Sequence, residues 1–350
     1  MKNRLWMIVV GVVIGLIAIV LSIQGNPANM AFCGACFIRD TAGAIGLHRA
    51  EAVQYIRPEI IGIVLGAFVI ALIKKEFVAK GGSAPLTRFI LGICVMIGAL
   101  IFLGCPVRMM LRIAGGDLNA VVGLVGFVGG ILTGIFFLNR GFSLRRSHEQ
   151  SIVEGAFMPV IKVILFVLLL IAPAFIFFSE IGPGAMHAPI WISLIGGLIV
   201  GGVAYWSRLC FVGGIRDALL FKNFNMLLGF GVMLAVLFVG NVVMGDFHFS
   251  FEGQPIAHTE WIWNIAGLYL VGLGSVLLGG CPLRQLVMAG SGNSDAGVTV
   301  IGLAVGAAIS HNFGLASSVD GTTPNGRIAF LIAVVVIFLI AILNIRKTSS

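Results

Sequence analysis

The stretch LIFLGCPVR at residues 100–108 decides the fold, because an apolar run of membrane-spanning length ends there in a Gly-Cys-Pro-x-Arg motif. The same arrangement returns as VLLGGCPLR at residues 276–284. Proline suits the first turn of a helix, since the N–H that it lacks would have no partner at that position. Each motif therefore predicts a new, short helix that begins directly after the cysteine.

The composition of the chain indicates that its solvent is lipid. Of its 350 residues, 59% are hydrophobic and only 10% are charged, whereas soluble globular proteins carry about 25% charged residues. This excludes a water-soluble enzyme domain. The net charge of +8 comes from 22 Lys and Arg residues that are scattered singly between apolar runs, so a nucleic-acid partner is not expected.

Ten apolar runs are long enough to cross a bilayer at about 20 residues per crossing. They leave no stretch for a separate soluble domain, so we predict an all-α polytopic membrane protein surrounded by lipid. The predicted spans are residues 5–23, 58–73, 86–103, 118–138, 158–178, 188–206, 225–243, 261–279, 297–313 and 327–345.

The distribution of basic residues predicts that both termini are cytoplasmic. With the amino terminus inside, 16 of the 22 Lys and Arg residues fall on the cytoplasmic side, and the loop 244–260 on the other side contains none. Positive residues are retained on the cytoplasmic side of membrane proteins.

An internal repeat divides the chain into membrane repeats at 1–180 and 181–350. The segment FCGACFIRD at 32–40 aligns with LCFVGGIRD at 209–217 at an offset of 177, and the two Gly-Cys-Pro-x-Arg motifs align at an offset of 176. Each half holds five spans, an odd number, so we expect the second repeat to be inverted. The segment 27–47 is too apolar for solvent and too interrupted to span, which predicts a re-entrant pair of half-helices lining a cavity; residues 104–117 have the same character.

These motifs supply the candidate site residues. Helix N-termini attract anions, and a polarisable thiol suits a soft anion. For Arg39 and Arg216, which precede aspartate, a structural ion pair is the alternative. Arg108 and Arg284 either attract an anion or extend to the membrane interface, and Cys94 is interpreted as a packing residue. The six histidines show no ligand spacing, so neither a metal site nor a cofactor is expected. The candidates for substrate binding are Cys33, Cys36, Cys105, Cys210, Cys281, Arg39, Arg108, Arg216 and Arg284.

With these motifs, the sequence resembles the YeeE/YedE sulfur-transport family over essentially its whole length. The segment at 32–40 is most similar to the YedE-like branch, whose members are described as proposed selenium transporters. The resemblance implies a non-enzymatic, pseudo-twofold protein of the bacterial inner membrane, in which pore cysteines pass the anion by S–H hydrogen bonds. Cys105 and Cys281 match the family's Gly-Cys-Pro cysteines. This chain departs from a three-cysteine relay because it carries both Cys33 and Cys36, and also Cys210.

The predicted function is transport of a small sulfur- or selenium-containing anion, with uptake of thiosulfate specifically as one alternative. A membrane thiol oxidoreductase is another alternative, favoured by the Cys33-x-x-Cys36 pair, and a non-catalytic partner of a sulfur-handling enzyme is a third. A cytoplasmic sulfurtransferase-like acceptor could dock at Arg208, Arg216 and Lys222, although the positive-inside rule also explains these residues. The sequence holds no Walker motif that would indicate direct driving by ATP.

Overall fold

The computed structural model describes residues 2–345, and its secondary structure is almost entirely helical. Two short strands, β1 (Lys80–Gly81) and β2 (His148–Glu149), pair antiparallel, with Lys80 opposite Glu149. The helices are α1 (Lys2–Ile23), α2 (Gly34–Ala44), the 3₁₀ helix η1 (Glu51–Val53), α3 (Pro58–Ile73), α4 (Pro85–Phe102), α5 (Pro106–Ala114), α6 (Leu118–Asn139), α7 (Ile152–Ile171), α8 (Gly182–Ala185), α9 (Ile190–Ser207), α10 (Phe211–Phe221), α11 (Asn225–Met244), α12 (Trp261–Leu278), α13 (Pro282–Gly290), α14 (Ser294–Asn312) and α15 (Pro324–Leu343).

Ten helical segments within residues 2–345 are long and apolar enough to cross a membrane, which confirms the predicted all-α polytopic membrane protein. In nine of them the long helix follows the predicted span closely, but α7 begins six residues before the predicted 158–178 and ends seven residues earlier. Ser151 and Glu154 form a capping box that starts the helix early. Ala172 adopts a left-handed conformation before Pro173 and ends it, while Pro159 is accommodated inside the helix.

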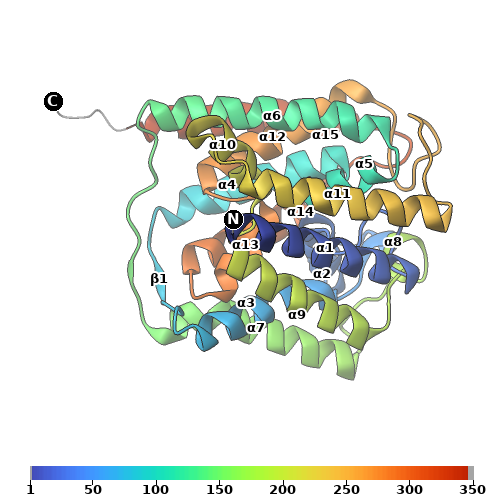
Figure 1. Ribbon diagram of the computed structural model, residues 1–350, viewed down its shortest axis with the longest axis horizontal. Helices are drawn as coiled ribbons and strands as arrows, with labels where there is room; N and C mark the ends of the chain where they lie inside the picture. The colour runs from blue at the N-terminus through green and yellow to red at the C-terminus, as the bar shows by residue number, and fades with distance from the viewer. Residues whose placement is uncertain (1, 346–350) are drawn as a thin grey trace.

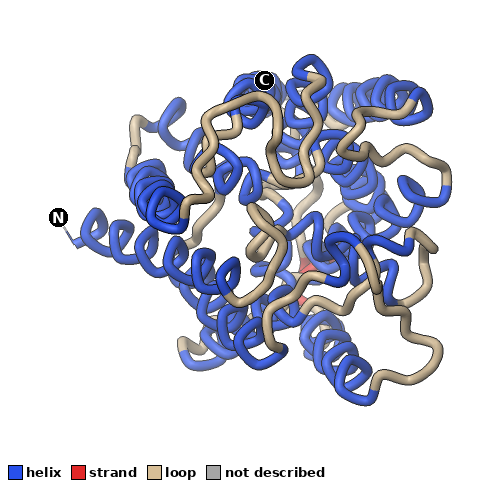
Figure 2. Tube along the Cα trace, turned by 90° about the vertical axis from the view of Figure 1, so that its right-hand side faces the viewer, coloured by secondary structure: helices blue, strands red, loops and turns tan. Residues whose placement is uncertain are grey.

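The long helices run roughly side by side along the longest axis of the molecule (Figure 1). The end of α15 and the start of α1 lie toward the left of this view, and the loop after α11 lies at the right. Figure 2 looks onto that right-hand face, which is crossed by loops. In the most apolar stretch of Pro85–Ala114, which comprises α4 and α5, 89% of the residues are buried, against 22% in α11 and 22% in α15. Helices α4 and α5 are therefore central, and α11 and α15 lie at the lipid-facing periphery.

Glycine allows the main helix pairs to approach closely. A Cβ atom on Gly66 of α3 would lie 2.1 Å from the carbonyl oxygen of Leu198 in α9, and a Cβ on Gly201 of α9 would lie 2.1 Å from that of Ile63. Small residues at such crossings let two backbones pack in the absence of a hydrophobic driving force in lipid. This explains part of the high glycine content, 48 of 350 residues.

The order and the packing of the helices are reciprocal between the two halves. In each half a long helix, a short one, two long ones, a short one and two long ones follow one another. Helix α1 packs on α11 as α9 packs on α3, and α6 packs on α12 as α14 packs on α4. The repeats 1–180 and 181–350 stay a prediction, which this reciprocity supports.

Four short helices begin directly after cysteines: α2 after Cys33, α5 after Cys105, α10 after Cys210 and α13 after Cys281. In Figure 1, α10 and α13 lie toward the left and α2 and α5 toward the right. The expected pair of half-helices at 27–47 is wrong in one respect, because only α2 is helical. The left-handed backbone of Asn29 (φ 56°) and Ala31 (φ 39°) turns the chain before α2 instead.

Candidate functional site: two thiol clusters

Three thiols gather where α2 and α5 begin. The sulfur of Cys33 lies 3.1 Å from that of Cys36 and 3.4 Å from that of Cys105. All three residues are completely buried, and all are free cysteines. We call Cys33, Cys36 and Cys105 the first thiol cluster.

Local helix geometry creates this cluster. Cys33 is the N-cap residue of α2, and its sulfur accepts a hydrogen bond from the backbone N–H of Cys36 at 3.5 Å. A residue three positions on lies on the same first turn, so the Cys-x-x-Cys spacing sets the two sulfurs side by side. Cys105 is the N-cap residue of α5, with Pro106 in the first turn. The predicted helix start after each Gly-Cys-Pro motif is thus confirmed.

Arg108 places a buried positive charge beside the first thiol cluster. One guanidinium nitrogen lies 3.8 Å from the sulfur of Cys36 and also donates to the carbonyl of Leu103. Nε donates to Asn29 Oδ1 at 2.9 Å, and Nη2 donates to the carbonyl of Ile256 at 2.9 Å. These oxygen partners are neutral, so Arg108 is held in position with its charge uncompensated by them.

Gly104 explains why the motif begins with glycine. A Cβ at this position would lie 2.7 Å from Cδ and 2.9 Å from Cβ of Arg108. Gly280 stands in the same relation to Arg284, with a Cβ 2.7 Å from Cγ. In both motifs the arginine side chain therefore folds back over the glycine.

Two further thiols form a second cluster where α10 and α13 begin. Cys210 is the N-cap residue of α10, and its sulfur accepts from the N–H of Gly213 at 3.4 Å. Cys281 is the N-cap residue of α13, and its thiol neighbours that of Cys210. Both residues are buried. We call Cys210 and Cys281 the second thiol cluster.

The two clusters adjoin each other inside the protein. A Cβ on Gly34, the first residue of α2, would lie 3.4 Å from the backbone nitrogen of Leu283 in the first turn of α13. The N-termini of α2 and α13 therefore meet. Because helix N-termini carry unpaired N–H groups and a partial positive charge, four of them around five thiols produce a positive potential without a metal.

The other predicted arginines are engaged differently. Arg39 donates to Asp40 at 2.6 Å, and both side chains are buried, as the ion-pair interpretation predicts. Arg216 pairs with Asp217 at 2.9 Å, and about a third of its side chain (34%) is exposed. Arg284 is half-buried with Nη1 buried and unpartnered. A binding role for all three stays a prediction.

The sequence analysis missed Arg57. Its Nε donates to Asp40 at 2.8 Å, and its other nitrogens donate to the carbonyls of Met186 and Pro183, at 2.9 and 2.6 Å. Arg57 also lies over the ring of Phe37. It fastens α2 to the start of α3, to α8 and to the residue that follows α8. Its position before a proline at the start of an apolar run gave no signal of this role.

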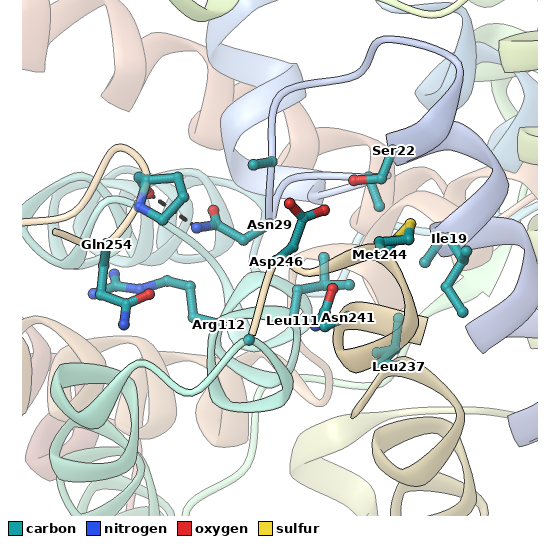
Figure 3. A pocket seen from close by; sticks show the side chains of 15 residues that line it. Ile19, Ser22, Asn29, Leu111, Arg112, Leu237, Asn241, Met244, Asp246 and Gln254 are labelled. Atoms are coloured by element: carbon teal, nitrogen blue, oxygen red, sulfur yellow. Dashed lines mark hydrogen bonds between the residues drawn. The ribbon is translucent and has the colours of Figure 1, made fainter. Parts of the chain in front are cut away.

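A cavity of about 100 Å³ lies between α1, α5 and α11, close to the segment that precedes α2 (Figure 3). Its polar lining includes Asn29, Arg112, Asn241, Asp246 and Gln254. Arg112 is buried and paired with Asp117 at 2.6 Å, with Nη2 unpartnered. Asn29 also accepts the hydrogen bond from Arg108, which lies beside Cys36. The cavity is therefore linked to the first thiol cluster through Asn29 and Arg108.

The described residues do not gather a metal site. Within residues 2–345, no group of three or more His, Cys, Asp and Glu side chains is arranged to hold a metal ion. The groups that the thiol clusters present are thiols, backbone N–H groups and nearby arginines.

Residues 206–347 match the sequence model of the family described as Sulphur transport. This part of the chain, about two fifths of it, is similar to that family. A segment of 107 residues, 31% of this chain, is 32% identical to the thiosulfate transporter TsuA of Escherichia coli (strain K12), of which it covers 30%. A segment of 120 residues, 34% of the chain, is 32% identical to TsuA of Spirochaeta thermophila and covers 35% of it. These matches span about a third of the length of the curated relatives.

The sulphur transport segment contains α10–α15 and therefore the whole second thiol cluster. The first thiol cluster precedes the matched residues. The predicted resemblance to the sulfur-transport family is confirmed.

Proposed function

We propose that this protein moves a small sulfur-containing anion across a membrane by way of the first and second thiol clusters. The observation that carries the proposal is the convergence of five buried cysteines and four helix N-termini inside a bundle of membrane-length helices. An ordinary packing role for the cysteines would not require each pair of short helices to place its N-cap cysteines side by side.

The physical task of such a path is to replace the water that an anion loses in the bilayer. Isolated charge in a low-dielectric interior is very costly. Helix N-termini offset this cost through their N–H groups and dipoles, and Arg108 adds a full charge at the first cluster. Thiols donate weak hydrogen bonds, which hold an anion loosely enough to release it. The anion passes between the clusters across the contact of Gly34 with Leu283, with no covalent step.

The substrate is a sulfur- or selenium-containing anion. Thiosulfate is supported by both relatives, which are thiosulfate transporters and match the chain over about a third of their length. The selenium alternative rests on the likeness of residues 32–40 to the YedE-like branch. The protein then acts as a transporter and not as an enzyme.

The proposed arrangement in the membrane follows the basic residues and the reciprocal helix packing. Both termini are cytoplasmic in a bacterial inner membrane, and the repeats 1–180 and 181–350 are inverted. In this orientation the first cluster is nearer the outside and the second nearer the cytoplasm, where a sulfurtransferase-like acceptor would receive the anion.

Uptake of labelled thiosulfate into proteoliposomes tests the proposal, with selenite and reduced selenium as competing species. We expect Cys105→Ala and Cys281→Ala to abolish uptake. Cys94→Ala is the matched control, because Cys94 is equally buried but lies in the middle of α4, outside both clusters. Uptake that persists in both cluster variants would overturn the proposal.

A thiol oxidoreductase is the second candidate, favoured by the 3.1 Å separation of the Cys33 and Cys36 sulfurs. Oxidation of this pair would form one S–S bond and pass two electrons and two protons to a quinone. Reduction of a soluble quinone by the dithiol-reduced protein, lost in Cys36→Ser, is the result that would favour this function over transport.

A further inference from the structure

A second, larger cavity opens on the side of the molecule where the termini lie. It has a volume of about 520 Å³ and is bounded by the ends of α3 and α9 and by one face of α13. We call it the basic basin. Its lining residues include Lys74, Glu76, Lys80, Tyr205, Trp206, Arg208, Arg284 and Met288.

Positive charge dominates the basic basin. Four of its lining side chains are basic and one is acidic, which leaves a formal excess of three positive charges. The carboxylate of Glu76 is already hydrogen-bonded by the Tyr205 hydroxyl at 3.0 Å. None of the ion pairs between described residues involves the four basic side chains. Like charges that share a polar cavity repel unless a counter-ion joins them.

Arg284 links the basin to the transport path. Its side chain folds over Gly280 and lines the basin, with Nη1 buried and without a hydrogen-bond partner in the described protein. Its charge lies close to both Cys210 and Cys281. This differs from Arg108, whose nitrogens are all engaged with protein oxygens. A buried guanidinium N–H without a partner is costly, and an anion that accepts from it removes this cost.

The basin is polar and open enough for an anion that keeps part of its water. Arg208, at the left-handed end of α9, is exposed at the rim, whereas Arg284 is half-buried beside the second thiol cluster. The ammonium nitrogen of Lys74 lies 4.5 Å from the centre of the Trp206 ring. It forms no ion pair with a carboxylate of the described residues. The charges therefore grade from exposed to buried toward Cys281.

We propose that the basic basin binds a divalent sulfur oxyanion and is the next binding site on the transport path after Cys281. Recognition is by charge and guanidinium hydrogen bonds, so sulfate binds there as thiosulfate does. A consequence is that oxyanions in the compartment on the termini side compete with the transported anion for the basic basin. The place of the basin in the path rests on the proposed function, whereas its binding of oxyanions does not.

Equilibrium binding to the purified full-length protein tests the inference, with labelled sulfate and thiosulfate as probes. We expect Arg208→Gln and Arg284→Gln each to weaken binding of both anions by at least about tenfold, and added salt to weaken wild-type binding. Arg140→Gln is the matched control, since Arg140 is exposed at the end of α6, lies over Phe136 and does not line the basin. Lys74→Gln replaces Arg284→Gln if that variant does not fold.

The outcomes separate the two proposals. Unchanged sulfate and thiosulfate binding in Arg208→Gln and in Arg284→Gln (or Lys74→Gln) would overturn the basin while leaving uptake through the thiols standing. If these variants lose binding while the wild-type protein takes up no anion in proteoliposomes, the basin is supported and the transport proposal is overturned.

Discussion

Alanine in place of Gly104 is the most informative single change, because Gly280 provides its matched counterpart. A Cβ at residue 104 would lie 2.7 Å from Arg108, and a Cβ at residue 280 would lie 2.7 Å from Arg284, so the steric clash is nearly equal. Neither glycine has a left-handed backbone, so alanine is tolerated by the backbone at both positions. The arginines differ in their partners, since Arg108 is tied to Asn29 and Ile256 and Arg284 has no comparable hydrogen bond.

The magnitude follows from the hydrogen bonds that must break. Moving Arg108 away from a new methyl group loses its bonds to Asn29 and Ile256, each worth about 1.5 kcal/mol or more for a charged donor. Gly104→Ala should therefore lower the free energy of unfolding by about 3 kcal/mol more than Gly280→Ala. The gain from restricting the unfolded chain, about 0.4–1 kcal/mol, is common to both variants and cancels in the comparison.

Thermal unfolding of the two variants in one detergent checks this, with labelled-anion uptake measured in parallel. We expect a melting temperature several degrees lower for Gly104→Ala than for Gly280→Ala. Equal melting temperatures, or a lower one for Gly280→Ala, would refute the argument that the two arginines differ in anchoring.

Three further predictions concern the surroundings of the site. A mild thiol oxidant should cross-link Cys33 to Cys36 and stop uptake, since the sulfurs are 3.1 Å apart and need to approach only to about 2.05 Å; mass spectrometry would detect the bond, and uptake unaffected by complete cross-linking would contradict the path. Asp40→Asn should cost about 3–5 kcal/mol of stability, because it leaves two buried arginines without their carboxylate, and an unchanged melting temperature would disprove this. Burial raises the pKa of the Glu260 carboxyl, but hydrogen bonds from the Thr322 hydroxyl and N–H outweigh it, so the net pKa is lowered. The stability that Glu260 supplies is then present above its unfolded pKa of about 4.3 and is lost as the pH falls through the lowered folded value, so the difference in melting temperature between wild type and Glu260→Gln should shrink below about pH 4; a difference that is constant from pH 6 to pH 3 would contradict it.

The thiol positions could be predicted from sequence because local rules fix them. Glycine and proline on either side of Cys105 and Cys281 determine a helix start regardless of what surrounds it, and the structure has a helix start there. The start of α7 could have been found from the Ser-x-x-Glu pattern at residues 151–154, but an apolar run read alone hides a polar first turn.

The partners of the arginines could not be predicted in the same way. Arg108 and Arg284 occupy equivalent positions in equivalent motifs. Arg108 donates hydrogen bonds to Asn29 and Ile256, whereas Arg284 lines the basic basin. These partners come from chain segments far away in sequence, and no periodicity or spacing reports which loop covers a helix end.

The sequence by itself determined that this is a helical membrane protein and where its thiols stand on their helices, because hydropathy and helix capping act over a few neighbouring residues. Only the tertiary structure decided that Cys33, Cys36 and Cys105 touch, that the start of α2 meets the start of α13, and that Arg57 fastens α2 to α3. The physical reason is that these contacts depend on how helices pack across long sequence separations, and that packing is set by the shapes of both partners together.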